Sequence, residues 1–122
     1  MGAVIKSCDR DSEYYFEEGC FITELLNDDR DPQVSIARAR VAPGETTRWH
    51  RLQGTSERYV ILEGRGEVEV DDLPRTAVGN GDVVLIPAGA AQRISNTGDS
   101  DLLFLAICAP RFKPEVYEDL EE

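Results

Sequence analysis

Short runs of β-forming residues, each ended by a turn, follow one another along most of this chain. Gly, Pro, Asn and Asp cluster about every 8–12 residues, and the intervening segments show no 3.6-residue period. This alternation predicts an all-β sandwich or barrel. The acidic tail Pro114–Leu120 is the one weak helix candidate. The expected strands are Phe21–Leu26, Val34–Val41, Thr46–Arg51, Arg58–Leu62, Glu67–Val70, Ala77–Val78, Val83–Ile86, Gln92–Ser95 and Leu102–Cys108.

Length and composition predict a single domain over residues 1–122. Apolar residues make up 41% of the chain and charged residues 30%, which suits a globule with its own core. The longest apolar run, Leu102–Pro110, is far shorter than the ~20 residues a membrane helix needs. No secretory signal opens the sequence, and three widely spaced cysteines do not form a disulfide framework. We therefore expect a cytoplasmic protein with no membrane partner.

The charge is strongly negative and unevenly distributed. Thirteen Lys and Arg against 24 Asp and Glu give −11 at pH 7. The excess lies in an acidic N-terminal arm (1–33) and an acidic tail (113–122), whereas residues 36–112 carry nine Arg and ten acids. A net-acidic chain repels phosphate backbones, so nucleic acid is not an expected partner. We expect solvated ends, and a homodimer formed through the nearly neutral central segment.

Two segments, 44–64 and 81–96, carry regular spacings. They read Gly44-x5-His50-x-Leu52-x4-Glu57-x6-Gly64 and Gly81-x5-Pro87-x-Gly89-x2-Gln92-x3-Asn96. These frames resemble the two signature motifs of the cupin superfamily, G-x5-H-x-H-x(3,4)-E-x6-G and G-x5-P-x-G-x2-H-x3-N. The resemblance implies a double-stranded β-helix, or jelly-roll barrel. Among cupins, the chain is most similar to the small mannose-6-phosphate isomerase-like group.

The departures from the motifs fall on the residues that hold metal in metal-binding cupins. His50 and Glu57 are kept, but Leu52 replaces the second His of the first motif and Gln92 replaces the His of the second. The resemblance therefore implies a metal site made of His50, Glu57 and Gln92. One nitrogen and two oxygen donors predict a weakly held divalent ion such as Mn, Zn, Ni or Mg.

Strand alternation adds candidate ligand-binding residues, because side chains two apart point to the same face. Arg48 shares parity with His50, and Tyr59 shares parity with Glu57. Arg40 shares a face with Arg38, and that face is either internal, where it needs an anion, or external. The expected substrate-binding residues are Arg48, Tyr59, Arg40 and Gln92.

Three functional hypotheses follow. The first is a weakly metal-dependent isomerase, epimerase or lyase in which His50 and Glu57 are metal ligands or a catalytic acid–base pair. The second is a non-catalytic, metal-free module that binds a small polar or anionic metabolite. The third is a structural protein with a vestigial cavity. Polar residues at three of the four cavity positions argue against this third hypothesis. The fold alone does not choose among them, since cupins host many activities.

Overall fold

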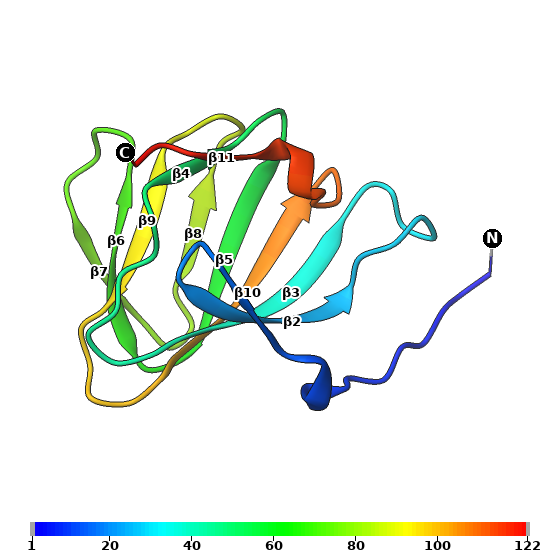
Figure 1. Ribbon diagram of the computed structural model, residues 1–122, viewed down its shortest axis with the longest axis horizontal. Coiled ribbons are helices and arrows are strands. Elements are labelled where there is room, and N and C mark those ends of the chain that lie inside the picture. The colour runs from blue at the N-terminus through cyan, green and yellow to red at the C-terminus, as the bar shows by residue number, and fades with distance from the viewer. Residues whose placement is uncertain (1, 122) are drawn as a thin grey trace.

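The computed structural model describes residues 2–121 and shows two antiparallel sheets, which confirms the predicted all-β jelly roll (Figure 1). The strands are β1 (Tyr14–Phe16), β2 (Cys20–Leu26), β3 (Ser35–Val41), β4 (His50–Leu52), β5 (Ser56–Glu63), β6 (Arg65–Val70), β7 (Thr76–Gly79), β8 (Val83–Ile86), β9 (Gln92–Asn96), β10 (Leu102–Ala109) and β11 (Tyr117–Asp119), and the 3-10 turns are η1 (Arg10–Ser12) and η2 (Pro114–Val116). The sheet orders are β1-β2-β3-β10-β5-β8 and β11-β4-β9-β6-β7. Across residues 2–121, no helix combines the length and apolar character that crossing a membrane would require.

The core lies between the two sheets, where alternate residues of each strand point inward. On β5, Glu57, Tyr59 and Ile61 are buried, while Arg58 and Val60 between them are partly exposed. This two-residue period is that of a strand with one face toward a core. Ile94 of β9 is fully buried in the same cluster, opposite the inward residues of β5 and β10. The sheets therefore present two rows of inward side chains to one interior.

The Gly and Asn residues of the two motifs hold turns and corners of the barrel. Gly64, between β5 and β6, has φ +86°, and a Cβ there would lie 2.8 Å from the Asp101 carbonyl oxygen. Only glycine fits without strain. Asn96 donates from Nδ2 to the carbonyls of Val41 and Ser100, and its Oδ1 accepts the Gly98 N–H. These motif residues fix the turns of the barrel and contribute no chemical group to the site.

The acidic tail is a strand, so the expected helix over Pro114–Leu120 is wrong. The 3-10 turn η2 leads into β11, which pairs with β4. Two ion pairs join these strands: Arg48–Asp119 at 2.7 Å and Arg51–Glu118 at 3.0 Å. Pairing to arginines far away in sequence outweighs the weak local helix preference. The expected strand Thr46–Arg51 is also shorter, with β4 confined to His50–Leu52 and one isolated bridge between Thr46 and Ser95.

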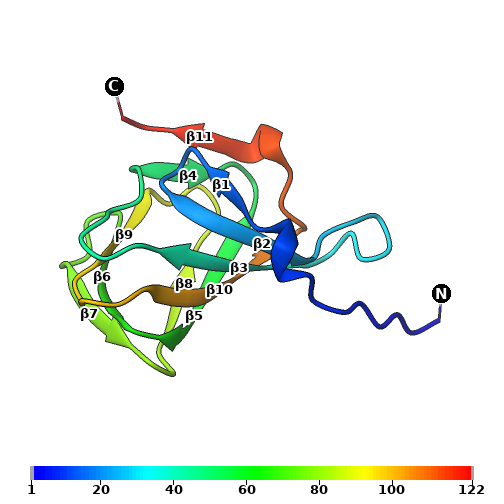
Figure 2. The same ribbon diagram turned by 60° about the horizontal axis from the view of Figure 1, so that its bottom comes forward.

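Much of the acidic N-terminal arm is part of the barrel rather than solvated chain. The hairpin of β1 and β2 extends the six-stranded sheet, with Tyr14 opposite Ile22 and Phe16 opposite Cys20. The segment before η1 leads away from the body of the molecule (Figure 2). The turn between β1 and β2 places Glu18 at the barrel interior, as described below.

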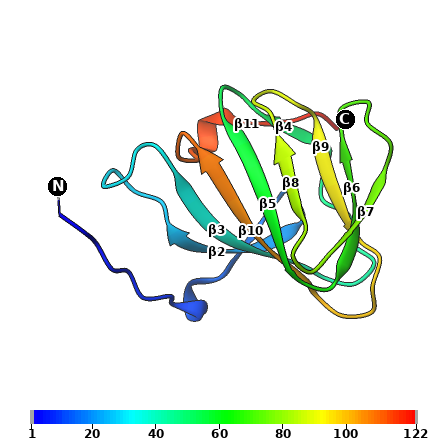
Figure 3. The same ribbon diagram turned by 180° about the vertical axis from the view of Figure 1, so that it is seen from behind.

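The outer face of the six-stranded sheet is largely apolar across β10, β5 and β8. These three strands run side by side (Figure 3). Leu105 lies beside Val60, and Val60 beside Val83. Val83 and Leu85 are 63% and 61% exposed. Exposed apolar side chains gathered on one face are typical of contact surfaces. The homodimer stays a prediction, and this face is where we expect it to form.

We predict that changing Val83 and Leu85 together to Asp separates the homodimer, because four carboxylates would be brought together at the contact. Light scattering at low ionic strength should give the mass of two chains for the wild type and of one chain for this variant. Ile5→Asp, at a residue 96% exposed in the N-terminal segment, should keep the wild-type mass. A wild-type mass of one chain would contradict the prediction.

Candidate functional site

The barrel interior brings together four of the six predicted site residues. His50 and Gln92 are cross-strand partners on β4 and β9, and Glu57 and Tyr59 face them from β5. All four are buried, with His50, Gln92 and Tyr59 each 1% exposed and Glu57 8% exposed. The Tyr59 hydroxyl donates to Gln92 Oε1 at 2.6 Å and so links the two sheets. The two motifs thus converge as strand alternation predicts.

Arg40 and Arg48, which the sequence also predicts to bind substrate, are not brought into this interior. On β3, Ala39 points into the cavity, so Arg40 points outward, where it contacts Glu13 at 2.8 Å. Arg48 precedes β4 and donates to Asp119 at 2.7 Å with a 39% exposed side chain. A guanidinium is costly to bury without an anion, and both find acids at the surface.

Glu18, which the sequence analysis did not single out, is a central residue of the site. It lies in the turn between β1 and β2, and its side chain is only 14% exposed. Its Oε1 is 3.7 Å from Nε2 of His50, and its Oε2 accepts from the Cys20 thiol at 3.6 Å. In sequence it is one acid of an acidic segment, with only the following Gly19 to indicate a turn.

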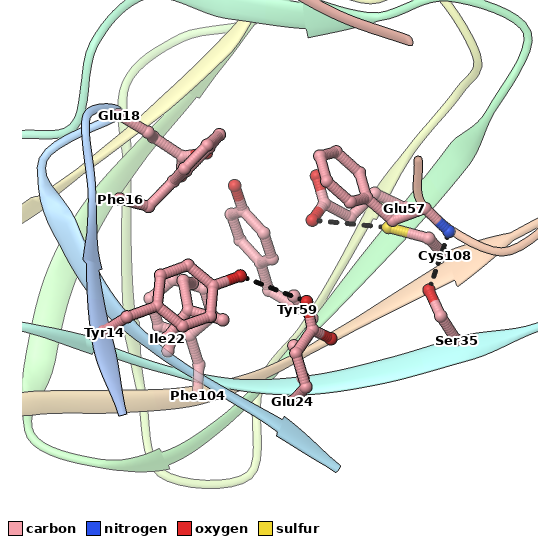
Figure 4. A pocket seen from close by; sticks show the side chains of 14 residues that line it. Tyr14, Phe16, Glu18, Ile22, Glu24, Ser35, Glu57, Tyr59, Phe104 and Cys108 are labelled. Carbon is pink, nitrogen blue, oxygen red and sulfur yellow. Dashed lines mark hydrogen bonds between the residues drawn. The ribbon is translucent and has the colours of Figure 1, made fainter. Parts of the chain in front are cut away.

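A cavity opens beside these residues on the inner face of the six-stranded sheet (Figure 4). Its volume of about 60 Å³ has room for roughly two water molecules at about 30 Å³ each. Tyr59 lies between Glu18 and Glu57 in Figure 4, and these three provide its inner polar groups. His50 lies behind Glu18, and Gln92 behind Tyr59, outside the cavity lining. The ligand-facing set is therefore Glu18, Glu57 and Tyr59.

Burial raises the pKa of both carboxyl groups into the neutral range. The pKa of Glu57 rises from 4.5 to about 7, mainly through burial and further through the charge of Glu18. Burial also raises the pKa of Glu18 to about 7. The Cys108 thiol donates to Oε2 of Glu57 at 3.7 Å, while Oε1 is buried with no hydrogen-bond partner among residues 2–121. Each carboxyl can therefore exchange a proton near pH 7.

His50 is held as a neutral base. Burial is the main influence on its pKa and lowers it below 6.5. Its Nδ1 lies 2.6 Å from the Arg48 carbonyl oxygen, which only accepts, so Nδ1 carries the proton and the Nε2 lone pair faces Glu18. The ring stacks on Tyr117 of β11 with centroids 5.1 Å apart. The Tyr117 hydroxyl is buried without a hydrogen-bond partner in the described chain.

The sequence matches the family description of the cupin domain over residues 37–108, more than half of the chain. It is also 33% identical over 115 residues to an uncharacterized protein of Methanocaldococcus jannaschii, covering 93% of this chain and 91% of that protein. The chain belongs to the cupin family.

Two of the similar proteins have names that state a function. The oxalate-binding protein of Thermotoga maritima is 38% identical over 72 residues, which cover 59% of this chain and 59% of that protein. The Streptomyces nucleoside dehydratase Pac13 superposes with a TM-score of 0.79 at 14% identity, over 97% of this chain and 92% of that one. The likeness to Pac13 is a likeness of fold alone.

Cupins often bind a divalent metal, but the residues here do not fit a tightly held one. Leu52 occupies one ligand position, and the Gln92 amide oxygen already accepts the Tyr59 proton. Within residues 2–121 no group of three or more His, Cys, Asp or Glu is arranged to hold a metal ion. A catalytic zinc site usually has three strong protein ligands. The predicted set of His50, Glu57 and Gln92 provides one imidazole, one carboxyl group and an engaged amide.

We predict that stability depends on pH through Glu57. Its pKa is about 7 in the folded protein and 4.5 ordinarily, so the folded state binds more protons in this range. This group therefore stabilises most below pH 4.5, and its contribution is lost as pH rises to about 7. The free energy of unfolding of Glu57→Gln, relative to that of the wild type, should increase by on the order of 2–3 kcal/mol from pH 4.5 to 7.5. Urea unfolding at four pH values measures the difference.

Glu69→Gln is the matched control, because Arg93 lowers the pKa of Glu69 below its usual value. Its stability difference from wild type should be nearly constant above pH 4.5 and should change only in stronger acid. A Glu57→Gln difference that is equally flat would show that Glu57 is not a buried, protonated carboxyl.

We also predict that Leu52→His combined with Gln92→His creates a tight metal site. The Leu52 and Gln92 side chains are 3% and 1% exposed. Both point inward like His50, Leu52 from the same strand β4 and Gln92 from the neighbouring strand β9. Three imidazoles and Glu57 would supply four strong ligands. Burying the new rings should cost about 1–3 kcal/mol without metal.

Added Zn²⁺ or Ni²⁺ should raise the melting temperature of this double variant well above its metal-free value and leave the wild type nearly unchanged. The control is Leu52→Asn with Gln92→Asn, which buries polar groups without imidazoles. If metal stabilises both double variants equally, or neither, the four positions do not converge.

Proposed function

We propose that this cupin is a metal-independent enzyme that transfers protons on a small molecule bound in the cavity. One observation carries the proposal: the buried carboxyl groups of Glu18 and Glu57 face the same cavity, and the neutral imidazole of His50 lies behind one of them. Two acids that titrate near neutral pH can serve as a general acid and a general base.

The roles of the residues follow from their surroundings. Ionised Glu57 accepts a proton from carbon, and protonated Glu18 donates its proton to an oxygen of the bound molecule. Burial keeps His50 neutral, and its Nε2 lies 3.7 Å from Glu18 Oε1, so this neighbour places no positive charge beside Glu18 that would favour loss of its proton. The Tyr59 hydroxyl proton is engaged by Gln92, so Tyr59 positions the ligand. Elimination needs these two proton transfers and no redox cofactor, and isomerisation and epimerisation also return a proton to carbon.

The fold likeness to a nucleoside dehydratase supports this class, because dehydration is an elimination. The mannose-6-phosphate isomerase-like subgroup stays a prediction. The relationship to an oxalate-binding protein supports a second candidate, a cupin that binds a small molecule without converting it. The two candidates place the ligand in the same cavity and differ in whether protons are exchanged.

Proton exchange with solvent tests the proposal. Mixtures of aldoses, ketoses, nucleosides, hydroxy acids and amines would be incubated with the protein in D₂O and followed by NMR. We expect at least one compound to raise the melting temperature and to gain deuterium at carbon or convert. Glu57→Gln should lower the conversion rate about 10²–10⁴-fold while the thermal shift persists.

Glu69→Gln, at the outer surface, should behave as wild type. A compound that raises the melting temperature, with neither exchange nor conversion at any pH between 6 and 8, would contradict the enzyme and support the binding module.

A further inference from the structure

We propose that the cavity selects a small organic cation, such as a protonated amine, and rejects anions. The inference deepens the proposed function, on which it rests for the location of the ligand. It departs from the small polar or anionic metabolite that the sequence analysis left open.

The charges of the cavity point to a cation. Three carboxyl residues line it, Glu18, Glu24 and Glu57, and no Lys or Arg of residues 2–121 does so. The nearby arginines point outward, where Arg40 pairs with Glu13. An anion entering this site would meet like charges in a poorly solvated space and would find no guanidinium or ammonium partner.

An unsatisfied acceptor marks where the cation would bind. Glu57 is 8% exposed, its Oε1 has no hydrogen-bond partner in the described chain, and the residue lines the cavity. An ammonium N–H would donate to this oxygen and neutralise the carboxylate at the same time. A neutral alcohol could satisfy the hydrogen bond but would not compensate the charge.

Aromatic side chains form much of the remaining wall. Tyr14, Phe16, Tyr59, Phe104 and Phe112 line the cavity, and the Tyr59 and Phe104 rings lie 4.5 Å apart. The Tyr14 hydroxyl donates to Glu24 at 3.1 Å. Ring faces attract ammonium groups, and the attraction is stronger where water is excluded. Carboxylates together with aromatic faces suit a small alkylammonium ion.

Binding should depend on pH because the carboxyls must ionise to pair with a cation. The groups that face Glu57 and Glu18 are His50 from β4, Cys108 from β10, Tyr59 from β5, Cys20 from β2 and Tyr117 from β11. Burial raises the pKa of each thiol and phenol and lowers that of His50. It brings the pKa of both glutamates to about 7, so they ionise as pH rises from 5.5 to 7.5. A cation should bind more tightly as they ionise.

Three probes of nearly the same shape separate charge from size: isobutylamine, isobutanol and isobutyrate. NMR titrations at pH 5.5 and 7.5 give their dissociation constants. We expect isobutylamine to bind at least tenfold more tightly at pH 7.5 than at pH 5.5, isobutanol to bind weakly at both, and isobutyrate not to bind. Glu57→Gln should weaken amine binding at least tenfold at pH 7.5 and flatten the pH dependence.

Two variants complete the test. Glu57→Asp, which keeps the charge, should retain the pH dependence, and Glu69→Gln should match the wild type. Binding of isobutanol or isobutyrate as tight as that of the amine would overturn the proposal, as would amine binding unaffected by Glu57→Gln. Deuterium exchange into a neutral or anionic compound would contradict the selectivity for cations and support the proposed enzymatic function. Tight amine binding without exchange into any compound would support the selectivity for cations and contradict the enzymatic function.

Discussion

Two carboxyl groups buried in one apolar barrel, in a cavity lined by no Lys or Arg of residues 2–121, are the constraint on which the site depends. Glu57 comes from β5 and Glu18 from the turn before β2, and burial raises the pKa of each to about 7. The neighbouring imidazole of His50 is neutral for the same reason, since burial disfavours its charged form as well. The interior therefore holds groups that exchange protons near neutral pH.

The arginines of the central segment act outside the barrel, where they secure the tail. Arg48 and Arg51 pair with Asp119 and Glu118, and this holds β11 against β4. Tyr117, at the start of β11, stacks on His50. Individually such exposed ion pairs contribute little, but together with the strand pairing they fix the tail over the site. Tyr117 thus links the acidic tail to the site through its contacts with His50 and with Phe16, which lines the cavity.

The two motif departures are compatible with a hydrogen-bonded interior instead of a metal-centred one. At one position Leu52 fills core space. At the other, Gln92 offers an amide oxygen that accepts the Tyr59 hydroxyl across the barrel. A buried tyrosine hydroxyl needs such a partner, and this pair satisfies both groups. The cavity beside it is left with carboxyl and aromatic walls.

Local patterns in the sequence predicted most strands and turns, because two-residue alternation and glycine turns depend on near neighbours. The inward positions of His50, Glu57 and Gln92 followed from the resemblance of the two motifs to those of cupins. Alternation alone does not say which face of β3 is internal. The structure decides this, because Ala39 lines the cavity and Arg40 therefore points outward. Glu18 lies more than 30 residues from His50 in sequence and reaches it only because the β1–β2 hairpin folds over the barrel. The tail pairs with β4 for the same kind of reason: long-range pairing is decided by tertiary packing, which no local pattern encodes.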